Sequence, residues 1–182
     1  EALRAAARPA GARLVYLANP DNPMGSWHEA ARIEAMVAAL PPGALLVLDE
    51  AYVEFAPAGT APRIDPEDSR VIRFRTFSKA HGMAGARVGY GIGAADLVAG
   101  FERVRNHFGM ARISQAGALA ALSDPGWLEL VRAEVAAART RIGAIAAANG
   151  LRALPSATNF VTVDCGGDGG FARAVLRETI AR

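Results

Sequence analysis

Lys79 is the residue of this sequence with the clearest potential for covalent chemistry. It is the one lysine among 20 basic side chains, and all the others are arginines. A guanidinium stays protonated and is a poor nucleophile, whereas a primary amine can condense with an aldehyde. We therefore expect Lys79 to be a catalytic residue that forms a covalent bond; a lysine that survived a general arginine bias by chance is the alternative.

Polar residues that could do chemistry follow three predicted strands: two short apolar runs, 13–18 and 44–48, and the segment 70–76, which alternates in its first half. Asn22 comes after the run 13–18, Asp49 directly after 44–48, and Lys79 soon after 70–76. Short apolar runs bounded by turn residues are typical of buried strands. In open α/β sheets the ligand lies beyond the carboxyl ends of the strands. We therefore expect Asn22, Asp49 and Lys79 to gather at one edge of a sheet.

The segments between and after these runs predict helices and a further strand. Ser26 and Glu29 are spaced as a capping box, which predicts a helix from Ser26 to about residue 40. A strand at 87–92 and a helix at 94–105 follow. This alternation predicts an α/β fold, with a mainly parallel sheet and helices on both faces.

The pattern changes in the last third of the sequence. Helices are predicted at 113–122 and 125–149, strands at 151–154 and 159–164, and a final helix from Phe171. We expect a larger domain over 1–124 and, over 125–182, a linker helix with the start of a small α+β domain. We also expect the chain to be a piece of a longer polypeptide.

Composition argues against several classes of protein. The net charge is +2, and the arginines are dispersed without interleaved aromatic residues, which does not favour nucleic-acid binding. No apolar run is long enough to span a membrane. The single cysteine, Cys165, excludes an internal disulfide framework and suits the cytoplasm. The three histidines have no metal-ligand spacing, so we expect no metal.

Four segments, in this order, resemble the signature of the fold-type I enzymes that use pyridoxal 5'-phosphate (PLP). Within that group the sequence is most similar to the histidinol-phosphate aminotransferases, and the resemblance covers essentially the whole chain. The matching segments are 19–25 (NPDNPMG), 48–55 (LDEAYVEF), 75–90 (RTFSKAHGMAGARVGY) and 155–160 (PSATNF).

The resemblance implies catalytic roles for Lys79, Asp49 and Tyr52. Lys79 would bind the cofactor covalently and move a proton. Asp49 would keep a proton on the pyridine nitrogen, where it makes the ring a better electron sink. Asn22 and Tyr52 would hydrogen-bond the ring hydroxyl. Taken alone, Asp49 and Asn22 would be ordinary turn residues and Tyr52 a core tyrosine.

The resemblance also implies a site for the cofactor phosphate and one contact to substrate. Arg87 would bind the phosphate in a bidentate manner, together with the hydroxyls of Thr76 and Ser78. A surface arginine is the alternative for Arg87. Asn159 matches a recurrent position near the substrate.

The implied reaction moves an amino group from a small-molecule donor, such as histidinol phosphate, to a 2-oxo acid, such as 2-oxoglutarate. A cytoplasmic homodimer is implied as well. Three alternatives remain open: a PLP-dependent decarboxylase or lyase of the same fold, a non-catalytic protein that retains the fold, and a nucleotide-binding oxidoreductase. The last is disfavoured, because Gly89, Gly91 and Gly93 lack the spacing of a dinucleotide-binding loop.

Overall fold

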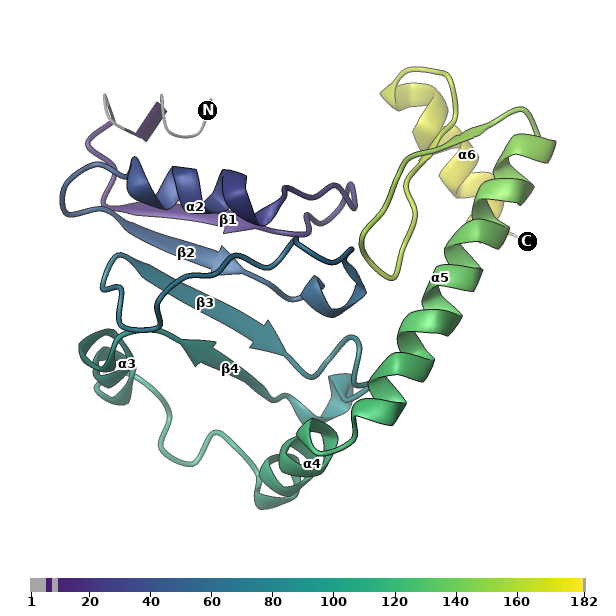
Figure 1. Ribbon diagram of the computed structural model, residues 1–182. Helices are drawn as coiled ribbons and strands as arrows, with labels where there is room; N and C mark the ends of the chain where they lie inside the picture. Colours follow the sequence, from purple (N-terminus) through teal and green to yellow (C-terminus); the bar gives the residue numbers. More distant parts are fainter. Residues whose placement is uncertain (1–5, 8–9, 182) are drawn as a thin grey trace.

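The computed structural model describes residues 6–7 and 10–181, and a four-stranded sheet forms its N-terminal part (Figure 1). The strands are β1 (Leu14–Ala18), β2 (Leu45–Asp49), β3 (Val71–Thr76) and β4 (Gly89–Ile92), in that order across the sheet. β1, β2 and β3 are parallel, which confirms the predicted mainly parallel sheet.

β4 is antiparallel to β3. The connection between them, residues 77–88, contains only tight turns and the short 3-10 helix η2 (Ala84–Ala86). A parallel pairing needs a crossover, usually through an α-helix, so this short connection returns the chain in the opposite direction. Gly89 permits the close pairing, because a Cβ there would lie 2.6 Å from the carbonyl oxygen of Arg75.

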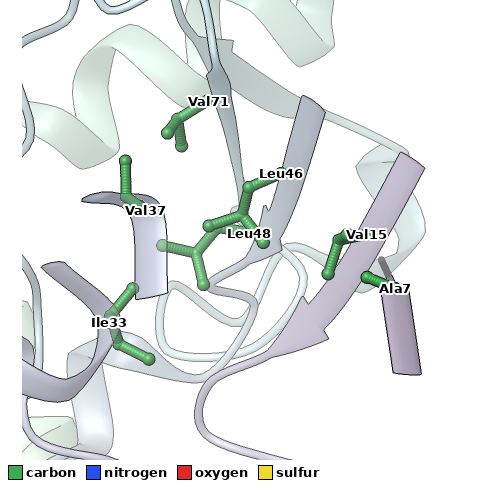
Figure 2. Close-up of a cluster of buried hydrophobic side chains, with 7 residues drawn as sticks. All are labelled: Ala7, Val15, Ile33, Val37, Leu46, Leu48 and Val71. Carbon is green, nitrogen blue, oxygen red and sulfur yellow. The ribbon is translucent and has the colours of Figure 1, made fainter. Parts of the chain in front are cut away.

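Helices cover both faces of the sheet, as predicted. On one face, α2 (Ala30–Ala38) buries Ile33 and Val37 against β1, β2 and β3. Figure 2 shows this cluster, whose members are Ala7, Val15, Ile33, Val37, Leu46, Leu48 and Val71. On the other face, the Phe101 ring of α3 (Ala95–Glu102) meets the Phe74 ring edge-on, with centroids 5.9 Å apart.

The predicted capping box at Ser26 is wrong, because α2 begins at Ala30 and no side chain caps it. The cause is the buried side chain of Asn19. Its Nδ2 donates to the His28 carbonyl (3.1 Å), and its Oδ1 accepts from the His28 N–H (2.8 Å). His28 is thereby held outside the helix, and the helix can start only after Glu29.

The C-terminal part consists mainly of helices. These are α4 (Arg112–Leu122), α5 (Pro125–Ala148) and α6 (Gly169–Ile180). Asp124 caps α5 by accepting from the Trp127 N–H, and Asp168 caps α6 by accepting from the Phe171 N–H. Because of that cap, α6 starts two residues before the predicted Phe171.

The two predicted strands of the tail are much shorter than expected. β5 (Arg152–Ala153) and β6 (Val163–Asp164) pair in antiparallel fashion over two residues each. Between them, the side chains of Ser156 and Thr158 bind each other and the Phe160 carbonyl. These local bonds hold the segment 155–160 as a turn, so residues 159 and 160, the start of the predicted strand 159–164, are not part of a strand.

The turn 155–160 is fixed to the N-terminal part by backbone and side-chain contacts. The Ala157 N–H donates to the Gly25 carbonyl at 2.8 Å. Arg139 of α5 donates through Nη1 to the carbonyls of Ser156 (2.9 Å), Thr158 (3.1 Å) and Phe55 (3.5 Å). One guanidinium thus joins α5, the turn and η1 (Val53–Phe55).

A buried ion-pair group follows β2. The Glu50 side chain is 1% exposed. Its carboxylate accepts from Arg73 Nη2 at 2.7 Å and from Arg75 Nε at 2.9 Å. The two arginines lie two residues apart on the same face of β3 and fix the start of the loop that carries Tyr52.

Replacing Glu50 by alanine is expected to destabilise the protein by about 3 kcal/mol, because two partly buried guanidinium groups would lose their counter-charge. Denaturant unfolding measures the change. Glu129→Ala is the matched control, since its pair with Arg132 is exposed; we expect a loss below about 1 kcal/mol. Equal losses of stability in the two variants would contradict the claim that the burial of Glu50 makes its ion pairs important for stability.

No helix within the described residues has both the length and the apolar character that crossing a membrane requires.

Candidate active site

The carboxyl ends of β1 and β2 open onto a depression of about 690 Å³. Its walls come from β1, from the loop 20–28 and from the loop after β2. Asp49, Asn22 and Tyr52 all line it, together with Tyr16. Two of the three polar residues that the sequence places after strands therefore share one hollow at the sheet edge.

Asp49 is the last residue of β2, and two donors fix its carboxylate. Oδ1 accepts from the Ala51 N–H at 3.0 Å, and Oδ2 accepts from the Tyr16 hydroxyl at 2.6 Å. This hydrogen bond to Asp49, with a smaller contribution from burial, raises the pKa of Tyr16 to about 12. The hydroxyl of Tyr16 therefore stays protonated, and remains a donor, at any pH near neutrality.

Asn22 and Tyr52 are brought into direct contact by the loops after β1 and β2. Asn22 Nδ2 donates to the Tyr52 hydroxyl at 3.1 Å. The Tyr52 ring is buried and meets the Phe160 ring edge-on, with centroids 5.4 Å apart. The phenol is therefore held in place by the core on one side and by an exposed amide on the other.

Lys79 lies beside this pair and is only half-exposed. Its Nζ is 5.2 Å from the centroid of the Tyr52 ring. The turn that carries it is closed by bonds from the Gly82 N–H to the Lys79 carbonyl and from the Met83 N–H to the Phe77 carbonyl, both 3.0 Å. The amine is thus placed against a specific aromatic ring, which a surface lysine would not require.

Thr76, Ser78 and Arg87 line a second, smaller depression of about 330 Å³. The Ser78 N–H donates to Thr76 Oγ1 at 3.1 Å, and Arg87 Nη1 donates to the Ala84 carbonyl at 2.8 Å. Arg87 has φ +49°, a left-handed conformation that few non-glycine residues adopt. Two hydroxyls and one exposed guanidinium form a donor set suited to a phosphate group.

Asn159 lies at the exposed tip of the turn 155–160. It makes no hydrogen bond to the other predicted site residues within the described part of the chain. Its neighbour Phe160 does reach the site, through the edge contact with Tyr52. The structure therefore brings the turn to the site, with Asn159 exposed on it.

Burial changes the titration of two side chains near the site. It raises the pKa of Glu54, two residues beyond Tyr52, and lowers the pKa of His81, two residues beyond Lys79. Glu54 Oε2 and His81 Nδ1 are buried and have no hydrogen-bond partner among the described residues. Desolvation therefore favours the neutral form of both groups.

Sequence reasoning missed Tyr16, Asn19 and Arg139. Tyr16 was read as one residue of an apolar strand, although a phenol in such a run is a signal that a polar partner is near. Asn19 and Arg139 act through backbone groups, of His28 and of the segments around Phe55 and Ser156, and no pattern in the sequence identifies those partners. Within the described residues, no three histidine, cysteine or acidic side chains are grouped in a way that could hold a metal ion.

Comparison with known proteins gives consistent matches. The family model for aminotransferase class I and II matches residues 1–180. Histidinol-phosphate aminotransferase 1 of Nitrosococcus oceani is 43% identical over 155 residues, which are 84% of this chain and 42% of that protein. The histidinol-phosphate aminotransferase of an Anaeromyxobacter species is 40% identical over 175 residues, covering 92% and 48% of the two chains.

A solved structure matches both the sequence and the fold. The crystal structure of histidinol-phosphate aminotransferase from Sinorhizobium meliloti, in complex with pyridoxal-5'-phosphate, is 55% identical, with a TM-score of 0.90. The match covers 94% of this chain and 47% of that one. The present chain thus spans about half the length of the relatives that it matches.

Proposed function

Because this chain belongs to the aminotransferase class I and II family, we propose that the protein is a PLP-dependent aminotransferase. The observation that carries the proposal is the position of Lys79. Its amine lies 5.2 Å from the ring of Tyr52, which is itself bonded to Asn22 beside the depression that Asp49 lines. A covalent anchor, a phenol–amide pair and a carboxylate are the groups that this cofactor requires.

The residues present fit PLP. The carboxylate of Asp49 is held at the rim of a hollow and has lone pairs left to accept from a ring nitrogen. The Asn22–Tyr52 pair offers donors to a ring hydroxyl. Thr76, Ser78 and Arg87 offer hydroxyls and a cation to a phosphate. When bound, PLP supplies an electron sink for the carbon from which the amino group leaves.

Each side chain of this set then has one task. Lys79 Nζ holds the cofactor covalently and, when released, carries a proton to and from the substrate carbon. Asp49 keeps a proton on the ring nitrogen. Tyr52 and Asn22 orient the ring through its hydroxyl, and Arg87 with Thr76 and Ser78 anchors the phosphate end.

We further propose histidinol phosphate, or a similar amino compound, as the donor and 2-oxoglutarate as the acceptor. The similarity to histidinol-phosphate aminotransferases over most of this chain supports that choice. Asn159 is proposed to lie near the substrate, since its turn is fixed next to Tyr52 through Phe160. A cytoplasmic homodimer and a division of the chain into 1–124 and 125–182 also remain part of the proposal.

An end-point assay tests the proposed reaction in the protein expressed at its natural length. With PLP, histidinol phosphate and 2-oxoglutarate, we expect glutamate to form in proportion to the donor. A decarboxylase of the same fold would form no glutamate here; given a phosphorylated amino acid, it would instead release carbon dioxide from the carboxyl group without needing the 2-oxo acid. A protein that binds PLP but yields neither product would contradict the aminotransferase assignment and favour a non-catalytic role.

A further inference from the structure

Tyr16 makes a short polar contact in the candidate active site. Its hydroxyl lies 2.6 Å from Asp49 Oδ2, which is in the short range expected when a hydroxyl donates to a carboxylate. Tyr16 is 59% exposed. The contact is therefore not a by-product of core packing.

The register of the sheet explains how the two residues meet. Tyr16 is paired with Val47, and Ala18 with Asp49, in the parallel ladder of β1 and β2. Tyr16 and Asp49 thus lie on the same face, offset by two residues along the strands. That diagonal is too long for a small side chain, but a phenol is long enough to cross it.

Each of the two donors to Asp49 binds a different oxygen of its carboxylate. The Ala51 N–H binds Oδ1 and the Tyr16 hydroxyl binds Oδ2, so rotation about the carboxylate bond would break both. An ionised carboxylate has about four acceptor positions, so capacity remains for a third donor on the side of the depression.

We propose that Tyr16 is a positioning residue of the active site: its hydroxyl fixes the carboxylate of Asp49 in the orientation that receives the ring nitrogen of PLP. This inference rests on the proposed function. Tyr16 acts through Asp49 and has no direct contact with the reacting atoms. Its raised pKa is consistent with this role, because a tyrosine that remains protonated can donate throughout the working pH range.

The test compares Tyr16→Phe with Thr140→Val in the protein at its natural length. Thr140→Val is the control, because it also removes one hydroxyl group, from an exposed residue of α5 that lines neither depression of the candidate site. For Tyr16→Phe we expect about ten-fold weaker binding of PLP and about ten-fold lower kcat, as for the loss of one hydrogen bond to a charged group. The KM for the amino donor should stay within about two-fold, since the lost contact does not bind the donor.

A double variant separates positioning from a merely structural role. If Tyr16 acts through Asp49, then adding Tyr16→Phe to Asp49→Asn should weaken PLP binding much less than it does in the unaltered protein. Additive losses, or losses that follow a lower stability in denaturant, would overturn the proposal.

The outcomes also distinguish this inference from the function on which it rests. If the unaltered protein takes up no PLP on Lys79, both are wrong. If it takes up PLP and Tyr16→Phe binds PLP as tightly as Thr140→Val does, only the role of Tyr16 is overturned.

Discussion

Replacing Lys79 by arginine is expected to abolish covalent attachment of PLP and to lower the rate of amino transfer by a factor of about 10⁴, the upper range for the loss of a positioned acid–base group. Arginine keeps the positive charge next to the Tyr52 ring but cannot condense with an aldehyde. Borohydride reduction followed by peptide mass analysis measures the attachment. In the unaltered protein, a pyridoxyl adduct should appear on the peptide that contains Lys79.

The single lysine of this chain allows a control that moves the amine away from the site. Because Lys79 is the only lysine in the sequence, Arg141→Lys can be added to Lys79→Arg, which moves the single lysine to an exposed position on α5. The double variant should show neither an adduct nor activity. An adduct on residue 141, or none on Lys79 in the unaltered protein, would contradict the idea that the site selects this amine.

Replacing Asp49 by asparagine is expected to lower kcat by a factor of about 10²–10³, similar to the loss of one preorganised electrostatic contact in an active site. Asparagine has nearly the same shape, and its side-chain oxygen can still accept a hydrogen bond, so the fold should be retained. What is lost is the negative charge that keeps a proton on the ring nitrogen. Steady-state kinetics measures the change.

The borohydride experiment shows whether the lower rate reflects lost turnover or lost attachment of PLP. Asp49→Asn should still give the adduct on Lys79, since the amine is unchanged, so attachment and turnover would be separated. Asp96→Asn is the control, because Asp96 is an exposed residue in the first turn of α3, and its activity should remain within about two-fold of the original. A normal rate in Asp49→Asn would show that another group protonates the ring.

The positions of β1 and β2 were predictable from the sequence, because both are continuous apolar runs. The run 44–48 became β2 almost unchanged, and Asp49 is its last residue. The direction of β4 was not predictable from composition, since it depends on how the connection 77–88 turns. The start of α2 was misjudged for a similar reason: a local capping pattern competed with the Asn19–His28 bonds, which the sequence does not reveal.

The candidate site, like the fold, was predictable only in part. Its ingredients were found from residue type and motif, and the structure places Asn22 against Tyr52 and Lys79 beside the same ring. The geometry that supports them was not found. Tyr16 reaches Asp49 across a strand ladder whose register becomes visible only in three dimensions. The roles of these residues remain predictions until the variants are measured.

The bonds of Arg139 couple the movement of α5 to that of the turn 155–160. Its guanidinium bonds carbonyls on the turn 155–160 and on η1, while its backbone belongs to a 24-residue helix. Rotation of α5 about its own axis must either carry the turn along or leave three carbonyl groups without a partner, and the second outcome is costly. A displacement of α5 is therefore expected to be transmitted to the turn 155–160, and through Phe160 to the ring of Tyr52.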